Sequence, residues 1–109
     1  MIRIKICDDF SDAPGGRYIS EGDFSGELFR ESILIQKYKE AIEQKTDLEI
    51  DFDGCYGFGT SFLEEAFGGM VRVHHEHGML KKLRFISTED ETIPRNIRKY
   101  IEKAEEKDR

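Results

Sequence analysis

The segment from Leu48 to Val71 constrains the fold more than any other, because its hydrophobic periodicity changes once, at a turn that contains glycines. Apolar and acidic residues alternate over residues 48–52, which is typical of a strand with one buried face. From Phe62 onward, apolar residues recur at the spacing of one side of a helix. The sequence therefore predicts a strand, a turn and a helix in direct succession.

Two hydroxyl-bearing residues, Thr60 and Ser61, lie where this helix is expected to begin. Ser61 is followed three residues later by Glu64, the spacing of a capping box, in which the hydroxyl accepts from a free backbone N–H and the carboxylate reaches back. We therefore expect Ser61 to cap the helix. A phosphate at this position would meet free N–H groups and the positive end of the helix dipole, so Ser61 is also a candidate switch.

The N-terminal part of the chain is expected to form a hairpin followed by a helix. Residues 2–6 alternate as in a strand, and residues 17–20 are expected to return beside them as an antiparallel strand, which gives a hairpin over residues 1–20. The helix that follows is expected to end at about residue 44. Two residues are candidate N-caps of this helix: Asp23 and Ser25.

The C-terminal part adds a strand at residues 83–87 and a last helix, and residues 104–109 are expected to form a frayed tail. A strand, a helix and another strand in this order form a right-handed crossover, so the strands at 47–53 and 83–87 should be parallel neighbours. The sequence thus predicts one α/β domain over residues 1–109, with a mixed sheet of about four strands and about three helices.

Charge and length argue against several classes of function. The 109 residues carry 17 basic and 23 acidic side chains, a net charge of −6, which opposes attraction to nucleic acid and to anionic membrane surfaces. No apolar run approaches the roughly 20 residues of a membrane-spanning helix, and the first residues alternate too strictly for a signal peptide. We expect a cytoplasmic protein, in which Cys7 and Cys55 are structural thiols rather than a disulfide.

Two stretches carry a resemblance to a known family: FSGELFRESIL at residues 24–34 and IDFDGCYGFGTSFLEEAFGGMVR at residues 50–72. With the order of the expected elements, they resemble the STAS domain, which is shared by sulfate-transporter tails and anti-sigma-factor antagonists. They resemble more closely the bacterial STAS-like family of unknown function. The resemblance implies a signalling role and a protein partner, since members of that family look associated with ATPase domains of the histidine-kinase type.

In anti-sigma-factor antagonists the corresponding turn reads approximately Asp-Ser-Ser-Gly-Leu, and the partner ATPase phosphorylates its second hydroxyl. Matched onto this chain, Gly59 takes the aspartate position, Thr60 the first hydroxyl and Ser61 the second, while Phe62 replaces the glycine. The resemblance therefore implies a phosphorylation switch at Ser61 or, second to it, at Thr60. Gly59 and Phe62 depart from the family pattern.

The residues around this turn form the candidate surface for a partner, because aromatic side chains in loops are enriched where proteins bind one another. We interpret the protein as a non-enzymatic regulatory module without a cofactor, which docks a partner through residues 56–62 and the helix that follows. A second copy of the chain is another expected partner. The candidate partner-binding residues are Tyr56, Gly57, Phe58, Gly59 and Phe62.

The alternative is a small enzyme that binds a nucleotide or another anion at the Gly57–Gly59 turn, with nearby histidines. Glycine loops do bring backbone N–H groups close to phosphates, but this turn lacks the third glycine of a dinucleotide site and the lysine of a P-loop. The histidines are His74, His75 and His77. Their spacing does not gather three imidazoles on one helical face, so we expect no metal site.

A pair of glycines, Gly68 and Gly69, lies inside the predicted helix. Each glycine in a helix interior costs about 1 kcal/mol relative to alanine. We therefore expect a closely packed neighbour at this point to compensate.

Overall fold

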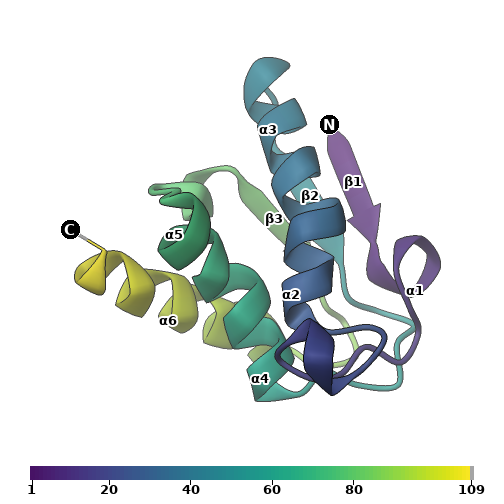
Figure 1. Cartoon of the computed structure of the whole chain (residues 1–109). Helices are drawn as coiled ribbons and strands as arrows, with labels where there is room; N and C mark the ends of the chain where they lie inside the picture. Colours follow the sequence, from purple (N-terminus) through teal and green to yellow (C-terminus); the bar gives the residue numbers. More distant parts are fainter. Residues whose placement is uncertain (109) are drawn as a thin grey trace.

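The computed structural model describes residues 1–108 and has a sheet of three parallel strands at its centre (Figure 1). These strands are β1 (Ile2–Lys5), β2 (Leu48–Asp51) and β3 (Leu83–Ile86), in that spatial order. Ile50 of β2 lies opposite Ile4 of β1 and Phe85 of β3. The predicted parallel pairing of the second and third of these strands is therefore confirmed.

Two long helices connect the strands, and both lie on the same face of the sheet, as right-handed crossovers between sequential neighbours require (Figure 1). Each helix is continuous and has a π-helical segment in its middle. The first consists of α2 (Gly26–Phe29), η2 (Arg30–Leu34) and α3 (Ile35–Glu43), and the second of α4 (Thr60–Leu63), η3 (Glu64–Gly68) and α5 (Gly69–His74). The last helix, α6 (Thr92–Lys107), packs against η3 and α5. Single helical turns form α1 (Ile6–Asp9), η1 (Ile19–Glu21) and η4 (Met79–Lys81).

The two faces of the sheet differ, as the alternating sequence predicts. The inner face contributes Ile4, Leu48 and Ile50, which are buried against the helices. On the outer face, Arg3 pairs with Glu49 at 3.0 Å across neighbouring strands. Because only one face is covered, the core lies between the sheet and its helical layer.

The first crossover helix begins at one of its two predicted caps. The Ser25 hydroxyl accepts a hydrogen bond from the backbone N–H of Leu28 at 3.1 Å, and Ser25 is the residue immediately before α2. A capping side chain satisfies one of the N–H groups that a helix start leaves free. Ser25 therefore fixes where this helix starts, and Asp23 is not the cap.

The predicted hairpin over residues 1–20 is wrong, because residues 17–20 do not form a strand. The backbone of this segment instead serves the start of α2, where the carbonyl of Arg17 accepts from the N–H of Glu27 at 3.0 Å. Within the described chain, β1 pairs with β2 alone. The segment is a loop that packs over the beginning of a helix, and its backbone hydrogen bonds are used there.

The α/β class is confirmed, with corrections to the expected elements. The described residues form three parallel strands and about four helices, instead of a mixed sheet of four strands with three helices. Predicted fraying from residue 104 is wrong as far as Lys107, since α6 continues to that residue and Ala104 is buried in the core. Residue 109 lies outside the described residues. None of the helices described is long and apolar enough to cross a membrane.

Candidate functional site

The carboxyl ends of the three strands meet at one edge of the sheet, which is where open parallel sheets bind their ligands (Figure 1). The backbone N–H of Tyr56 donates to the carbonyl of Asp12 at 2.8 Å, and the N–H of Gly54 donates to the carboxylate of Glu89 at 2.8 Å. These bonds join three connecting segments into one surface. The segments are residues 10–25, 52–59 and 87–91.

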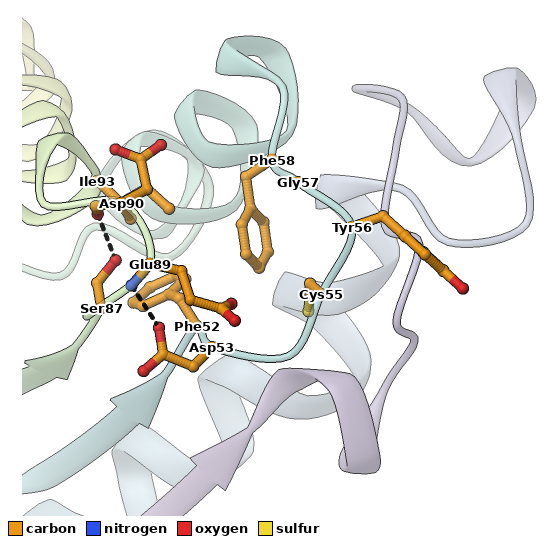
Figure 2. Close-up of a pocket in the computed structure, with 10 residues that line it drawn as sticks. All are labelled: Phe52, Asp53, Cys55, Tyr56, Gly57, Phe58, Ser87, Glu89, Asp90 and Ile93. Atoms are coloured by element: carbon orange, nitrogen blue, oxygen red, sulfur yellow. Dashed lines mark hydrogen bonds between the residues drawn. The ribbon is translucent and has the colours of Figure 1, made fainter.

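Asp53 anchors the turn after β2 to the loop after β3. Its carboxylate accepts from the hydroxyl of Thr88 at 2.7 Å and from the backbone N–H of Thr88 at 2.9 Å. It also accepts from the backbone N–H of Glu89 at 3.1 Å (Figure 2). The Thr88 hydroxyl, followed by the Glu89 N–H, holds the pKa of Asp53 below its usual value. Because this carboxylate stays charged and accepts three hydrogen bonds, it holds the beginning of the turn in a fixed position.

A cavity of about 220 Å³ lies between these two loops (Figure 2). Its walls are the aromatic rings of Phe52 and Phe58, which meet edge to face with centroids 5.3 Å apart, and three carboxylates. Small-molecule sites usually measure about 300–1,000 Å³, and an acidic wall repels phosphate. The cavity therefore does not suit a nucleotide. The acidic residues are Asp53, Glu89 and Asp90.

The predicted partner-binding residues differ sharply in exposure. Tyr56 is 88% exposed and points away from the cavity, whereas Phe58 points into it (Figure 2). Gly57 and Gly59 are exposed at the turn. Phe62 is fully buried in the core and packs 5.8 Å from the ring of Phe58. Phe62 is therefore a core residue, and its assignment to the docking surface is wrong.

Ser61 is exposed and does not cap its helix. The helix begins at Thr60, and its cap position is Gly59, which has no side chain to accept a hydrogen bond. The predicted capping box is therefore wrong, because the Glu64 carboxylate binds Arg17 and Arg72 instead of reaching back. Ser61 lies in the first turn of a continuous helix with its hydroxyl available at the surface.

A network of ion pairs joins the two crossover helices at their π-helical segments. Arg30 of η2 and Glu65 of η3 are only 3% and 6% exposed, and their charged groups lie 2.7 Å apart. Glu65 also lies 3.2 Å from Arg17 and 3.3 Å from Arg72. Sequence reasoning missed this network. The sequence feature that could have predicted it is the pair Glu64 and Glu65, which lies among the apolar residues of a helix and is followed two turns later by Arg72.

Glycines let the two helices approach at the same place. A Cβ atom on Gly69 would overlap the guanidinium of Arg30, and one on Gly26 would overlap the carbonyl oxygen of Phe62. A Cβ on Gly68 would lie 2.5 Å from the Glu64 carboxylate. The expected compensation by a closely packed neighbour is therefore confirmed at Gly69, where Arg30 of the other helix fills the space, whereas Gly68 accommodates side chains of its own helix.

The charged state of Glu64 depends on its arginines. Burial opposes ionisation of its carboxyl, but hydrogen bonds from Arg72 and Arg17 outweigh that effect and lower the pKa. The same hydrogen bonds raise the pKa of both guanidinium groups. The surface part of the network therefore stays fully ionised at neutral pH.

The histidines lie at the opposite end of the second crossover helix from the glycine turn. His74 contacts Glu31 at 2.6 Å, and His75 and His77 each lie 2.9 Å from Asp108. Thr60 and His74 bound this helix, which places the two ends roughly 20 Å apart at 1.5 Å per residue. The histidines and the turn therefore do not form one site. In residues 1–108, His, Cys, Asp and Glu side chains form no group of three with metal-binding geometry.

The two cysteines lie beneath the turn. Burial, followed by the nearby Cys7, raises the pKa of the Cys55 thiol to about 11. Burial and Asp8 raise the pKa of Cys7 as well. Thiols with raised pKa values are poor nucleophiles at neutral pH. Both are free, half-buried thiols, in agreement with a structural role.

Comparison with known proteins identifies a family for this chain. The profile of a family described as "STAS-like domain of unknown function (DUF4325)" matches residues 25–92. This span contains the stretch at residues 50–72 and all of the stretch at residues 24–34 except Phe24, and it confirms the STAS-like α/β fold. No curated protein and no solved structure matches the chain.

Proposed function

Since the chain belongs to the family of STAS-like domains of unknown function, we propose that it is a non-enzymatic regulatory module that docks a protein partner through the turn at residues 56–61. The observation that carries this proposal is the exposure of Tyr56. This aromatic side chain is 88% exposed, on a turn whose position is fixed by the hydrogen bonds of Asp53. Aromatic residues of this kind anchor protein interfaces. The docking surface consists of Tyr56, Gly57, Gly59, Thr60 and Ser61, with Phe58 beneath it.

The proposed partner is an ATPase of the histidine-kinase type, as the resemblance to anti-sigma-factor antagonists implies. It transfers the γ-phosphoryl group of ATP to the Ser61 hydroxyl, which releases ADP and the hydroxyl proton. Ser61 suits this role because it is exposed and is not engaged as a helix cap. The added charge of nearly −2 changes the surface beside Tyr56 that the partner contacts. Thr60 is the second candidate for the same reaction.

Two variants test the docking surface. Binding of a purified ATPase of this type is titrated against the wild type, Tyr56→Ala and Ser61→Asp, with Ile42→Ala as a matched control that removes another exposed apolar side chain far from the turn. We expect Tyr56→Ala to weaken binding about tenfold or more and the control to leave it unchanged. Equal affinity for all four proteins contradicts docking at the turn.

The phosphorylation step is tested separately by intact-mass analysis after incubation with the ATPase and ATP. We expect a gain of one phosphoryl group that Ser61→Ala removes.

Thermal-shift measurements with nucleotides and divalent metals address the enzyme alternative, because a ligand of the native state stabilises it. Saturable stabilisation by a nucleotide alone would favour that alternative. Light scattering after size exclusion reports whether a second copy is the partner instead.

A further inference from the structure

The residues around Ser61 form one continuous face of the second crossover helix. Ser61 precedes Glu64 by three residues and Glu65 by four, so all three lie on the same side of neighbouring helical turns. One nitrogen of Arg17, Nη1, contacts both carboxylates, at 2.5 Å from Glu64 and 3.2 Å from Glu65. The guanidinium of Arg17 therefore lies over the helical face that carries Glu64, Glu65 and Ser61. Ser61 is about one turn closer to the start of the helix than the two glutamates.

The backbone of Arg17 is held close to that helix start. Its carbonyl accepts from the N–H of Glu27, one residue after Gly26. Gly26 in turn packs directly against the carbonyl of Phe62, the residue after Ser61. Gly26 also lies against the Cβ of Glu65, so the loop that carries Arg17 crosses the helix at the level of Phe62 and Glu65, within about one helical turn of Ser61.

Arg17 is the member of the ion-pair network that is able to move toward Ser61. Its side chain is 29% exposed, compared with 4% for Arg30, which is enclosed between the helices. Arg72 is 40% exposed, but it follows Glu64 by eight residues and so lies on the side away from Ser61. Arg72 binds both Glu64 and Glu65 independently, at 2.5 and 3.3 Å. Both carboxylates therefore keep a partner if Arg17 moves.

Resting on the proposed phosphorylation, we infer that Arg17 is the residue of this chain that binds the phosphate on Ser61. The guanidinium exchanges the Glu64 carboxylate for the phosphate, one helical turn away. A phosphoserine carries nearly two negative charges and three acceptor oxygens, so it is a stronger ligand for a guanidinium than one carboxylate. Repulsion between the phosphate and the two glutamates drives the same exchange.

The exchange alters the surface next to the turn. Arg17 is followed in its loop by Tyr18 and Ile19, which are 47% and 53% exposed. When the guanidinium moves to Ser61, this loop is fixed to the helix start instead of to Glu64. Phosphorylation is thereby transmitted to apolar side chains that lie outside the turn itself.

The inference is tested on protein with phosphoserine incorporated genetically at position 61, so that no kinase is required. The phosphate pKa, ordinarily near 6, is measured by ³¹P NMR in the wild type and in Arg17→Gln, Arg17→Lys and Arg98→Gln. We expect the phosphate pKa in the wild type to lie about 0.5 or more below that in Arg17→Gln. Arg17→Lys should retain part of the difference, and Arg98→Gln, an equal loss of charge on α6, should match the wild type.

Equal phosphate pKa values in the wild type and Arg17→Gln overturn the inference, whatever an ATPase does to Ser61. A second measurement does not need phosphoserine: urea midpoints of Ser61→Asp, Arg17→Gln and the double variant. We expect Ser61→Asp to lower the midpoint further when Arg17 is absent, because the new carboxylate then faces Glu64 and Glu65 without a cation of its own. Strictly additive midpoints contradict the inference. Loss of phosphorylation by the partner contradicts only the proposed function.

Discussion

Two regions of this domain differ in how they use burial. One is the helix crossing, where the two crossover helices meet at Arg30 and Glu65, and the other is the turn at residues 53–59. At the crossing, the charged side chains of Arg30 and Glu65 are buried, and glycines at positions 26 and 69 bring the two helices together around them. At the turn, the Asp53 carboxylate accepts hydrogen bonds from the loop after β3, while Tyr56 is left in solvent. The crossing specifies how the helices pack, and the turn presents a surface.

The difference shows that the charged side chains at the helix crossing have a structural role. Buried ion pairs gain little net stability but are costly to break, because removal of one partner leaves an uncompensated charge. They therefore act as a constraint on helix position more than as a source of affinity for ligands. The exposed turn has no such constraint on its outer side chains, which leaves them free to change with function.

The largest effect is expected at the crossing. Glu65→Ala removes the carboxylate that three arginines share and leaves the buried guanidinium of Arg30 with the exposed Glu31 as its remaining acidic partner. We expect a loss of about 3–5 kcal/mol in the free energy of unfolding, measured by urea denaturation. The control Glu40→Ala breaks an exposed pair with Lys37 and should cost less than about 0.5 kcal/mol. Similar losses of stability for both variants would mean that the buried ion pair between Arg30 and Glu65 does not constrain the position of the helices.

The underside of the turn should resist chemical modification. With Cys7 replaced by serine, Cys55 is the only thiol, and burial, the largest of the causes that raise its pKa to about 11 in the wild type, remains. A raised pKa lowers the thiolate fraction at pH 8, and one unit lowers it about tenfold. We expect a reaction with Ellman's reagent about tenfold or more slower than in the urea-unfolded protein. Equal rates would show that the underside of the turn is open.

Close approach of the helices is tested by Gly26→Ala. The added methyl group meets the backbone of Phe62, which cannot rotate away. We expect destabilisation of about 1–3 kcal/mol, measured by thermal or urea unfolding. Gly15→Ala is the matched control, because no atom lies within 4 Å of the added carbon. A gain in stability at Gly26 would mean that the helices are further apart than described.

The smallest effect on stability is expected at the tip of the turn. Tyr56→Ala removes a side chain that is 88% exposed and should change the free energy of unfolding by less than about 0.5 kcal/mol. Phe58→Ala, two residues later, removes a ring packed on Phe52 and should cost more than about 1 kcal/mol. Unfolding curves of the two variants make the comparison. A large loss for Tyr56→Ala would make it a structural residue instead of a docking residue.

Local pattern was sufficient for most of the fold. The change of period between residues 48 and 71 predicted a strand, a turn and a helix, and the crossover rule predicted parallel pairing of β2 with β3. The loop at residues 17–20 was misassigned because Tyr18 and Ile19 are apolar, although both are exposed in the structure. Apolar residues in a short segment predict burial only when the segment has a partner, and this one binds the start of α2.

The candidate site divides in the same way. The sequence by itself determined that a glycine-containing turn precedes a helix and that Ser61 lies near the start of that helix. Only the tertiary structure decided that Phe62 belongs to the core, that Glu64 binds arginines, and that Arg30 meets Glu65 between two π-helical segments. The contacts that Arg17 and Arg30 make with Glu64 and Glu65 join residues 35 to 48 positions apart in the chain. Periodicity reports which face of an element is apolar, whereas the partners of its charged side chains are set by how two elements cross.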